Sequence, residues 1–118
     1  MKYNIIQQKS YEFALKSVAI YKKIITENKE YVLSKQFLRS STSIGANIEE
    51  TIGAQSDKDF LSKISIAYKE ARETHYWLRL LKDSHYISEN DAIEMLSLCD
   101  EILRIIGEIQ ITIKNRNS

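Results

Sequence analysis

Four polar residues near the middle of the chain recur at helical spacing and could form a binding site. Arg39, Ser43, Asn47 and Glu50 are separated by four, four and three residues, which places them on one face of a helix. Glu73, further along the chain, is a candidate partner for the arginine. Because charged groups buried in a helical bundle must be paired, we favour a structural polar layer. The alternative is a small site for a ligand or an RNA phosphate.

The residue types that usually perform catalysis or bind metals are isolated from one another. Neither His75 nor His85 has a glutamate three residues before it, so the Glu-x-x-His pairs of di-iron bundles are missing. The single cysteine, Cys99, has no CxxC partner for zinc, and both histidines are predicted on a different helix. We therefore predict no catalytic residue, no metal site, no cofactor and no enzymatic activity.

The composition predicts one all-α domain over residues 1–118. The chain contains no proline and only three glycines, which permits long uninterrupted helices. A chain of this length buries about two thirds of its unfolded surface, so it needs no disulfide or metal for stability. The lone cysteine indicates a reducing compartment, and no apolar run suits a signal peptide or a membrane span. We expect a cytoplasmic protein with no membrane partner.

Apolar periodicity predicts helices at about 8–28, 31–54, 57–84 and 89–114. The short links between them favour an antiparallel, up-down-up-down four-helix bundle. In the first helix the predicted apolar stripe consists of Tyr11, Ala14, Leu15, Val18, Tyr21 and Ile25. In the second helix it consists of Leu33, Phe37, Ser41, Ile44, Ile48 and Ile52. The second stripe passes in phase through poor helix formers at 39–47, so we predict that this segment is helical too.

The third predicted helix has one apolar seam and the fourth has two. The seam of the third helix is Phe60, Ile64, Ala67, Ala71, Thr74, Leu78 and Leu81. The first stripe of the fourth helix is Leu96, Cys99, Leu103, Ile106 and Ile113, and we assign it to the core. The second stripe is Met95, Leu98, Ile102, Ile105 and Ile109. Because a bundle helix needs only one buried stripe, we predict that the second forms a homo-oligomer interface; the alternative is a wide core face.

Charge is unevenly distributed along the chain. Residues 1–48 carry eight Lys or Arg against three Glu, whereas residues 49–118 carry nine basic against thirteen acidic residues. The candidate nucleic-acid contacts in the basic half are Lys9, Lys16, Lys22, Lys23 and Lys29. Three glutamates interleave with these lysines and could pair with them instead. RNA or DNA is therefore one candidate partner, and another protein is the alternative.

Two segments resemble a known family. Residues 36–39 (Gln-Phe-Leu-Arg) and 43–50 (Ser-Ile-Gly-Ala-Asn-Ile-Glu-Glu) resemble the signature of the four-helix-bundle family of 23S rRNA intervening-sequence proteins. Residues 56–61 and Glu73 fit the next segment of that pattern, and the likeness spans roughly residues 8–112. The chain departs from the family at Thr51, where a glycine is usual. This difference concerns the end of the second helix and leaves the fold unaffected.

The resemblance implies a left-handed four-helix bundle that is typically a homopentamer. Some relatives are encoded inside intervening sequences of ribosomal RNA genes. Another relative, the accessory variability determinant of diversity-generating retroelements, resembles a basic pentamer that binds nucleic acid and a reverse transcriptase. We therefore expect a self-assembling, non-enzymatic accessory module that binds a protein or a nucleic acid. The alternative is a purely structural interaction protein with no affinity for nucleic acid.

Overall fold

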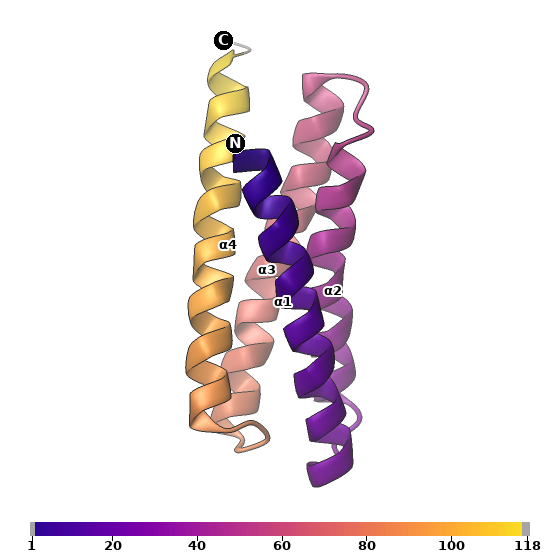
Figure 1. The fold of residues 1–118 in the computed structure, drawn as a ribbon, viewed down its shortest axis with the longest axis vertical. Coiled ribbons are helices and arrows are strands. Elements are labelled where there is room, and N and C mark those ends of the chain that lie inside the picture. The colour runs from indigo at the N-terminus through magenta and orange to yellow at the C-terminus, as the bar shows by residue number, and fades with distance from the viewer. Residues whose placement is uncertain (1, 117–118) are drawn as a thin grey trace.

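The computed structural model describes residues 2–116, and every regular element in this range is a helix. Helix α1 (Lys2–Lys23) continues into one turn of π-helix, η1 (Ile24–Asn28). The other helices are α2 (Leu33–Thr51), α3 (Asp57–Asp83) and α4 (Glu89–Arg116). They lie side by side in an elongated body of 49 × 21 × 19 Å, and each helix runs opposite to the one before it (Figure 1). The predicted all-α four-helix bundle is confirmed.

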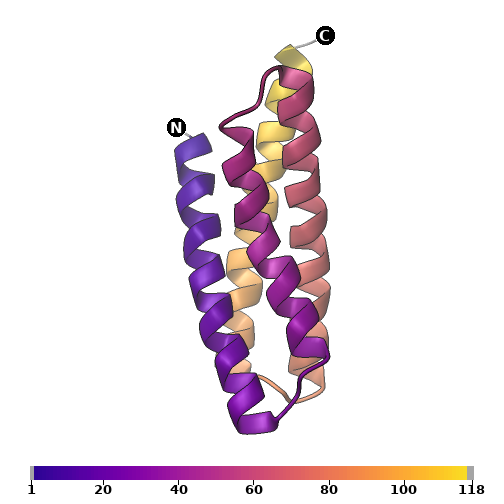
Figure 2. The ribbon, with the colours of Figure 1, turned by 90° about the vertical axis from the view of Figure 1, so that its right-hand side faces the viewer.

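The order of the helices around the bundle decides which faces are covered. Helix α1 packs against α2 and α4, and α3 packs against the same two helices. Figure 2 shows α1 and α3 on opposite sides, with α2 in front and α4 behind. The outer faces of α1 and α3 therefore point in opposite directions.

Local capping residues explain where α3 and α4 begin. The Ser56 hydroxyl accepts a hydrogen bond from the backbone N–H of Asp59 at 3.0 Å. The Ser88 hydroxyl accepts one from the backbone N–H of Asp91 at 3.1 Å. Both serines directly precede the predicted helix starts at residues 57 and 89. Helix α1, in contrast, begins six residues before the predicted residue 8.

Helix α2 passes without a break through its segment of poor helix formers. The hydroxyls of Ser40, Ser41 and Thr42 donate to backbone carbonyls one turn earlier in the same helix, so they do not compete with it. Small residues here also bring α1 close: a Cβ added to Gly45 would lie 3.4 Å from the carbonyl oxygen of Ser10. Helix α1 thus approaches α2 closely at this point. The stripe ends sooner than predicted, because α2 ends at Thr51 and Ile52 is exposed.

The inward face of α1 differs from the predicted stripe. Its buried residues are Ile6, Ser10, Phe13, Ser17, Ile20 and, in η1, Ile24. The predicted Tyr11 and Leu15 are instead 62% and 56% exposed. The true face contains two serines, whose hydroxyls are satisfied by carbonyls of their own helix. Burying them therefore leaves no polar group unpaired, and the more apolar neighbouring stripe remains partly in solvent.

Candidate functional site

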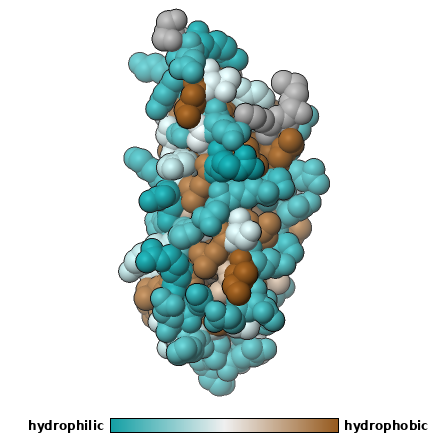
Figure 3. All heavy atoms as spheres, turned by 90° about the vertical axis from the view of Figure 1, so that its left-hand side faces the viewer, coloured by the Kyte–Doolittle hydropathy of each residue, from teal (hydrophilic) through white to brown (hydrophobic). Residues whose placement is uncertain are grey.

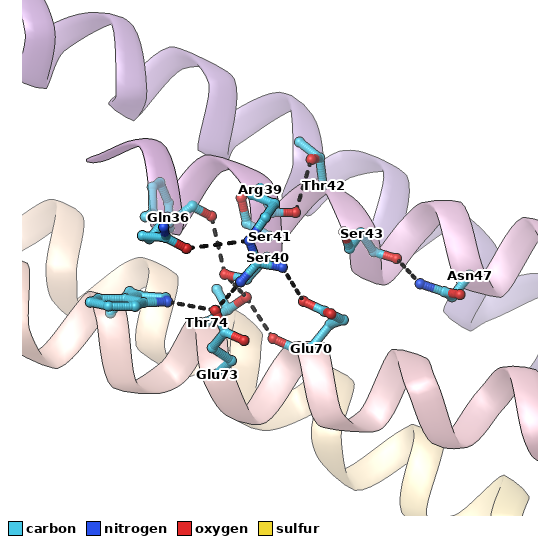
Figure 4. A network of polar contacts seen from close by, with 12 residues as sticks. Gln36, Arg39, Ser40, Ser41, Thr42, Ser43, Asn47, Glu70, Glu73 and Thr74 are labelled. Carbon is cyan, nitrogen blue, oxygen red and sulfur yellow. Dashed lines mark hydrogen bonds and ion pairs between the residues drawn. The ribbon is translucent and has the colours of Figure 1, made fainter. Parts of the chain in front are cut away.

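The predicted polar cluster forms around Arg39, which reaches from α2 to α3 (Figure 4). Its guanidinium donates to the carboxylate of Glu70 at 3.2 Å and also pairs with the carboxylate of Glu73. The side-chain oxygen of Gln36 accepts a further bond at 3.3 Å. The indole N–H of Trp77 donates to the same Glu73 carboxylate at 2.8 Å. The predicted pairing of Arg39 with Glu73 is thus present, and sequence spacing did not identify Glu70 and Trp77 as partners.

The depth of this cluster differs from the prediction. The Arg39 side chain is 47% exposed, so the pair lies at the surface of the bundle rather than in a buried layer. Asn47 lies two turns further along α2 and donates to the backbone carbonyl of Ser43 at 2.8 Å (Figure 4). Glu50 is exposed near the end of α2. Arg39, Ser43, Asn47 and Glu50 therefore lie along α2, and Glu73 lies on the neighbouring helix α3. The five side chains do not converge on one cavity.

Three of the five candidate nucleic-acid lysines face carboxylates of α4. Lys9 pairs with Glu101 at 2.7 Å and Lys16 with Glu94 at 3.7 Å. Lys23 pairs with Asp91 at 2.8 Å. Phosphate binding would have to displace these carboxylates, which weakens the case for this surface. Lys22 and Lys29 are exposed.

The predicted oligomer interface on α4 is wrong for four of its five residues. Met95, Ile102, Ile105 and Ile109 are buried within the single chain, and Leu98 is partly buried against the core. The salt bridges from α1 to Glu94 and Glu101 show that this side of α4 faces α1. A second helix thus covers the second stripe, which is the wide core face. On the α4 side of the molecule, apolar atoms appear along the middle of a largely hydrophilic surface (Figure 3).

Cys99 and His75 both make structural contacts within the bundle. Cys99 is fully buried, and its thiol donates to the carbonyl of Ala71 at 3.3 Å. Burial, reinforced by the charge of Asp100, raises the pKa of the Cys99 thiol to about 12. The thiol is therefore not a thiolate nucleophile at neutral pH. His75 Nε2 lies 3.1 Å from the carboxylate of Asp100. No cluster of three metal-ligating side chains occurs in the described part of the chain.

Two exposed surfaces were given no function by the sequence predictions. One is the exposed apolar flank of α1 around Tyr11 and Leu15. The other is the outer face of α3, where Lys69, Arg72 and Arg79 surround Tyr76. Spacing of three and four residues did identify the first set, as the predicted apolar stripe of the first helix, and it would also have revealed the second, which occupies one side of α3.

These features define a class of protein: a small helical bundle whose candidate functional side chains lie on exposed helix faces. The model of the 23S rRNA-intervening sequence protein family matches residues 2–108, and the chain belongs to this family. It is similar to a solved protein of unknown function from the S23 ribosomal protein family of Bacteroides thetaiotaomicron. That likeness has 47% identity and a TM-score of 0.91, over 93% of this chain and 98% of the other. No curated protein matched. No helix within residues 2–116 is long and apolar enough to cross a membrane.

Proposed function

We propose that the protein acts without catalysis, by assembling with further copies of itself through the apolar face of α1. This face consists of Tyr11, Ala14, Leu15, Val18, Tyr21 and Ile25. Two of its large side chains, Tyr11 and Leu15, are more than half exposed. Large apolar side chains gathered on one exposed face are typical of an interaction surface. This exposed face is the observation that carries the proposal.

A groove beside this face offers space for a partner side chain. Its volume is about 270 Å³. The residues that line it are Ser10, Tyr11, Ala14, Thr42, Gly45, Ala46 and Glu49. Small residues form much of this lining, which allows a second backbone to come near. A large side chain such as Leu15 of another copy fits the character of this space.

A second copy of the chain suits the face because the face carries no charge. A face whose charges all have one sign would repel a second copy, whereas an uncharged apolar face can pack against an apolar surface of another copy. Lys9, Lys16 and Lys23 of α1 point instead toward carboxylates of α4. The family resemblance implies five copies, and the face by itself suits two or more.

Light scattering on the purified full chain tests this proposal. We expect a mass several times the 13.7 kDa of one chain. Changing Tyr11 and Leu15 together to lysine should give a folded monomer, because both side chains are exposed and contribute little to the core. The matched control changes Ile93 and Ile111 of α4, which are similarly exposed, to lysine and should leave the assembly intact. A wild-type protein that is monomeric at high micromolar concentration would overturn the proposal.

A further inference from the structure

The outer face of α3 carries three cations around an exposed tyrosine. Lys69, Arg72, Tyr76 and Arg79 follow at spacings of three, four and three residues, which aligns them along one side of the helix. All four side chains are exposed. We propose that this α3 basic stripe binds single-stranded nucleic acid. The proposal goes beyond self-assembly and does not depend on it.

The cations of the stripe lack the ion pairs that neutralise other basic side chains. Arg39, Arg104 and Arg116 each pair with a carboxylate. Lys69, Arg72 and Arg79 make no ion pair with any carboxylate in the described residues. An unpaired cation keeps its full attraction for a phosphate, whereas a paired one must first release its carboxylate. The uncompensated charge of α3 therefore suits phosphate better than the paired lysines Lys9, Lys16 and Lys23 of α1 do.

A hollow lies beside the stripe, between α3 and α4. It has a volume of about 300 Å³ and is lined by Arg72, His75, Tyr76, Arg79, Asp100 and Leu103. The one carboxylate in this lining, that of Asp100, is 3.1 Å from His75 Nε2 and forms no ion pair with Arg72 or Arg79. The lining thus combines two guanidinium groups, an aromatic ring and an apolar side chain. These are the groups that contact phosphates and stack on bases.

The geometry of the stripe favours a strand over a single phosphate. Arg72 and Arg79 are seven residues apart, or about 10.5 Å along the helix axis, a separation that suits a ligand with charge at two or more points. Tyr76 lies between them, 52% exposed, and its ring meets Trp77 edge-on at a centroid distance of 5.1 Å. Trp77 supports the ring from one side, and the exposed side is available to stack on an unpaired base.

The position of the stripe allows it to work in an assembled protein. Helices α1 and α3 are diagonal in the bundle, so their outer faces point in opposite directions. Copies that associate through the apolar face of α1 would leave α3 open. A folded monomeric variant changed at Tyr11 and Leu15 should therefore still bind a strand, which separates failure of this proposal from failure of the first.

Fluorescence anisotropy with labelled oligouridine, oligothymidine and a duplex of equal length tests the proposal on the full chain. We expect the single strands to bind at low salt, with a slope of log affinity against log salt of about −2 for three phosphate contacts. Arg72→Ala and Arg79→Ala should each reduce that slope by about 0.7. Tyr76→Ala should weaken binding about 5- to 100-fold, whereas Tyr76→Phe should retain it because the ring remains. Binding of either single strand supports the site, and the ratio of the two shows whether the sugar contributes.

Exposed lysines outside the stripe provide the matched control. Lys22→Ala and Lys29→Ala should leave affinity unchanged, and circular dichroism should show that every variant keeps the helical fold. Failure of the wild type to bind single strands at low salt would overturn the proposal. The proposal would also be overturned if the duplex or polyglutamate bound as tightly as the single strands and Tyr76→Ala had no effect. That pattern requires only the attraction between charges. If the lysine controls lost binding and the stripe variants kept it, the site would lie elsewhere and the proposal would be rejected.

Discussion

The hydroxyl oxygens of Thr74 on α3 and Ser40 on α2 lie 2.9 Å apart, and both residues are fully buried. Each hydroxyl has one proton, so the bonds run in a chain: Thr74 donates to Ser40, and Ser40 donates to the carbonyl of Phe37 at 3.2 Å. Thr74 also has a second acceptor, the carbonyl of Glu70, at 2.8 Å. The small, satisfied side chains let α2 and α3 pack closely without leaving a buried proton unpaired.

Substitution of Ser40 separates the hydrogen bond from the packing. Ser40→Ala should lower the free energy of unfolding by less than about 1 kcal/mol, because Thr74 can turn to the Glu70 carbonyl. Ser40→Leu should lower it by about 1–3 kcal/mol, because the close contact has no room for a larger side chain. Urea denaturation at one fixed protein concentration measures both values. Equal losses for the two variants would show that the hydroxyl, rather than its size, matters here.

The surface position of Arg39 limits how much its ion pairs contribute to the free energy of unfolding. An exposed pair contributes about 0–1 kcal/mol, whereas breaking a buried pair costs about 3–5 kcal/mol. Arg39→Ala should therefore lower the free energy of unfolding by no more than about 1 kcal/mol. Thermal melts followed by circular dichroism give the difference, with Arg104→Ala as the control for another exposed pair. A loss near the value for a buried pair would mean that another molecule covers this face in the assembled protein.

The number of helices and two of their starting points could be predicted because the signals are local. Periodicity and the capping serines Ser56 and Ser88 act within a few residues. The inward face of α1 was missed because Ser10 and Ser17 interrupt its apolar pattern. Their hydroxyls bond to carbonyls at positions 7 and 13, so they are buried at little cost. Apolar character alone therefore pointed to the neighbouring stripe, which is exposed.

Features that depend on contacts between distant helices could not be predicted from one helix at a time. The second stripe of α4 is buried because α1 lies over it. Contacts such as the ion pair between Lys23 and Asp91, which are 68 residues apart in sequence, place α1 there. Glu73 was correctly predicted as a partner of Arg39. The sequence could not show how much water surrounds the pair, because that depends on how deeply the two helices pack together.

Glu30 caps the start of α2 and should make stability depend on pH. Its carboxylate accepts hydrogen bonds from the backbone N–H groups of Val32, Leu33 and Ser34 at 2.8–3.0 Å. Partial burial raises the pKa of the Glu30 carboxyl, but these bonds together outweigh it, and the pKa lies below its ordinary 4.5. A carboxyl with a lowered pKa stabilises the fold above its unfolded pKa. This stabilisation is lost as the pH falls through the folded pKa.

Glu30→Gln should therefore lower the free energy of unfolding by about 1 kcal/mol at neutral pH. The difference from wild type should shrink as the pH falls below 4.5, where the wild-type carboxyl becomes protonated. Urea denaturation over a pH series measures this change. Glu12→Gln, at an exposed carboxylate on α1, is the control and should show a smaller effect. A difference that stays constant down to acidic pH would show that the charge of Glu30 does not cap the helix.

Helix α3 ends in a turn that requires a left-handed residue at His85. The backbone N–H of Tyr86 donates to the carbonyl of Leu81 at 2.9 Å, and that of His85 donates to the carbonyl of Lys82 at 3.0 Å. These two bonds close the helix and hold His85 at a φ of 65°. Glycine is the residue usually found at this position, because a Cβ makes the left-handed conformation unfavourable.

His85→Gly should raise the free energy of unfolding by about 1 kcal/mol, since it removes the strain of a side chain in left-handed backbone. The His85 side chain is exposed, so little packing is lost with it. His85→Ala is the matched control: it removes the imidazole but keeps a Cβ, and should give no gain. Thermal and urea denaturation of the three proteins distinguish backbone strain from side-chain effects. If the alanine variant is as stable as the glycine variant, the imidazole rather than the backbone is the source of the strain.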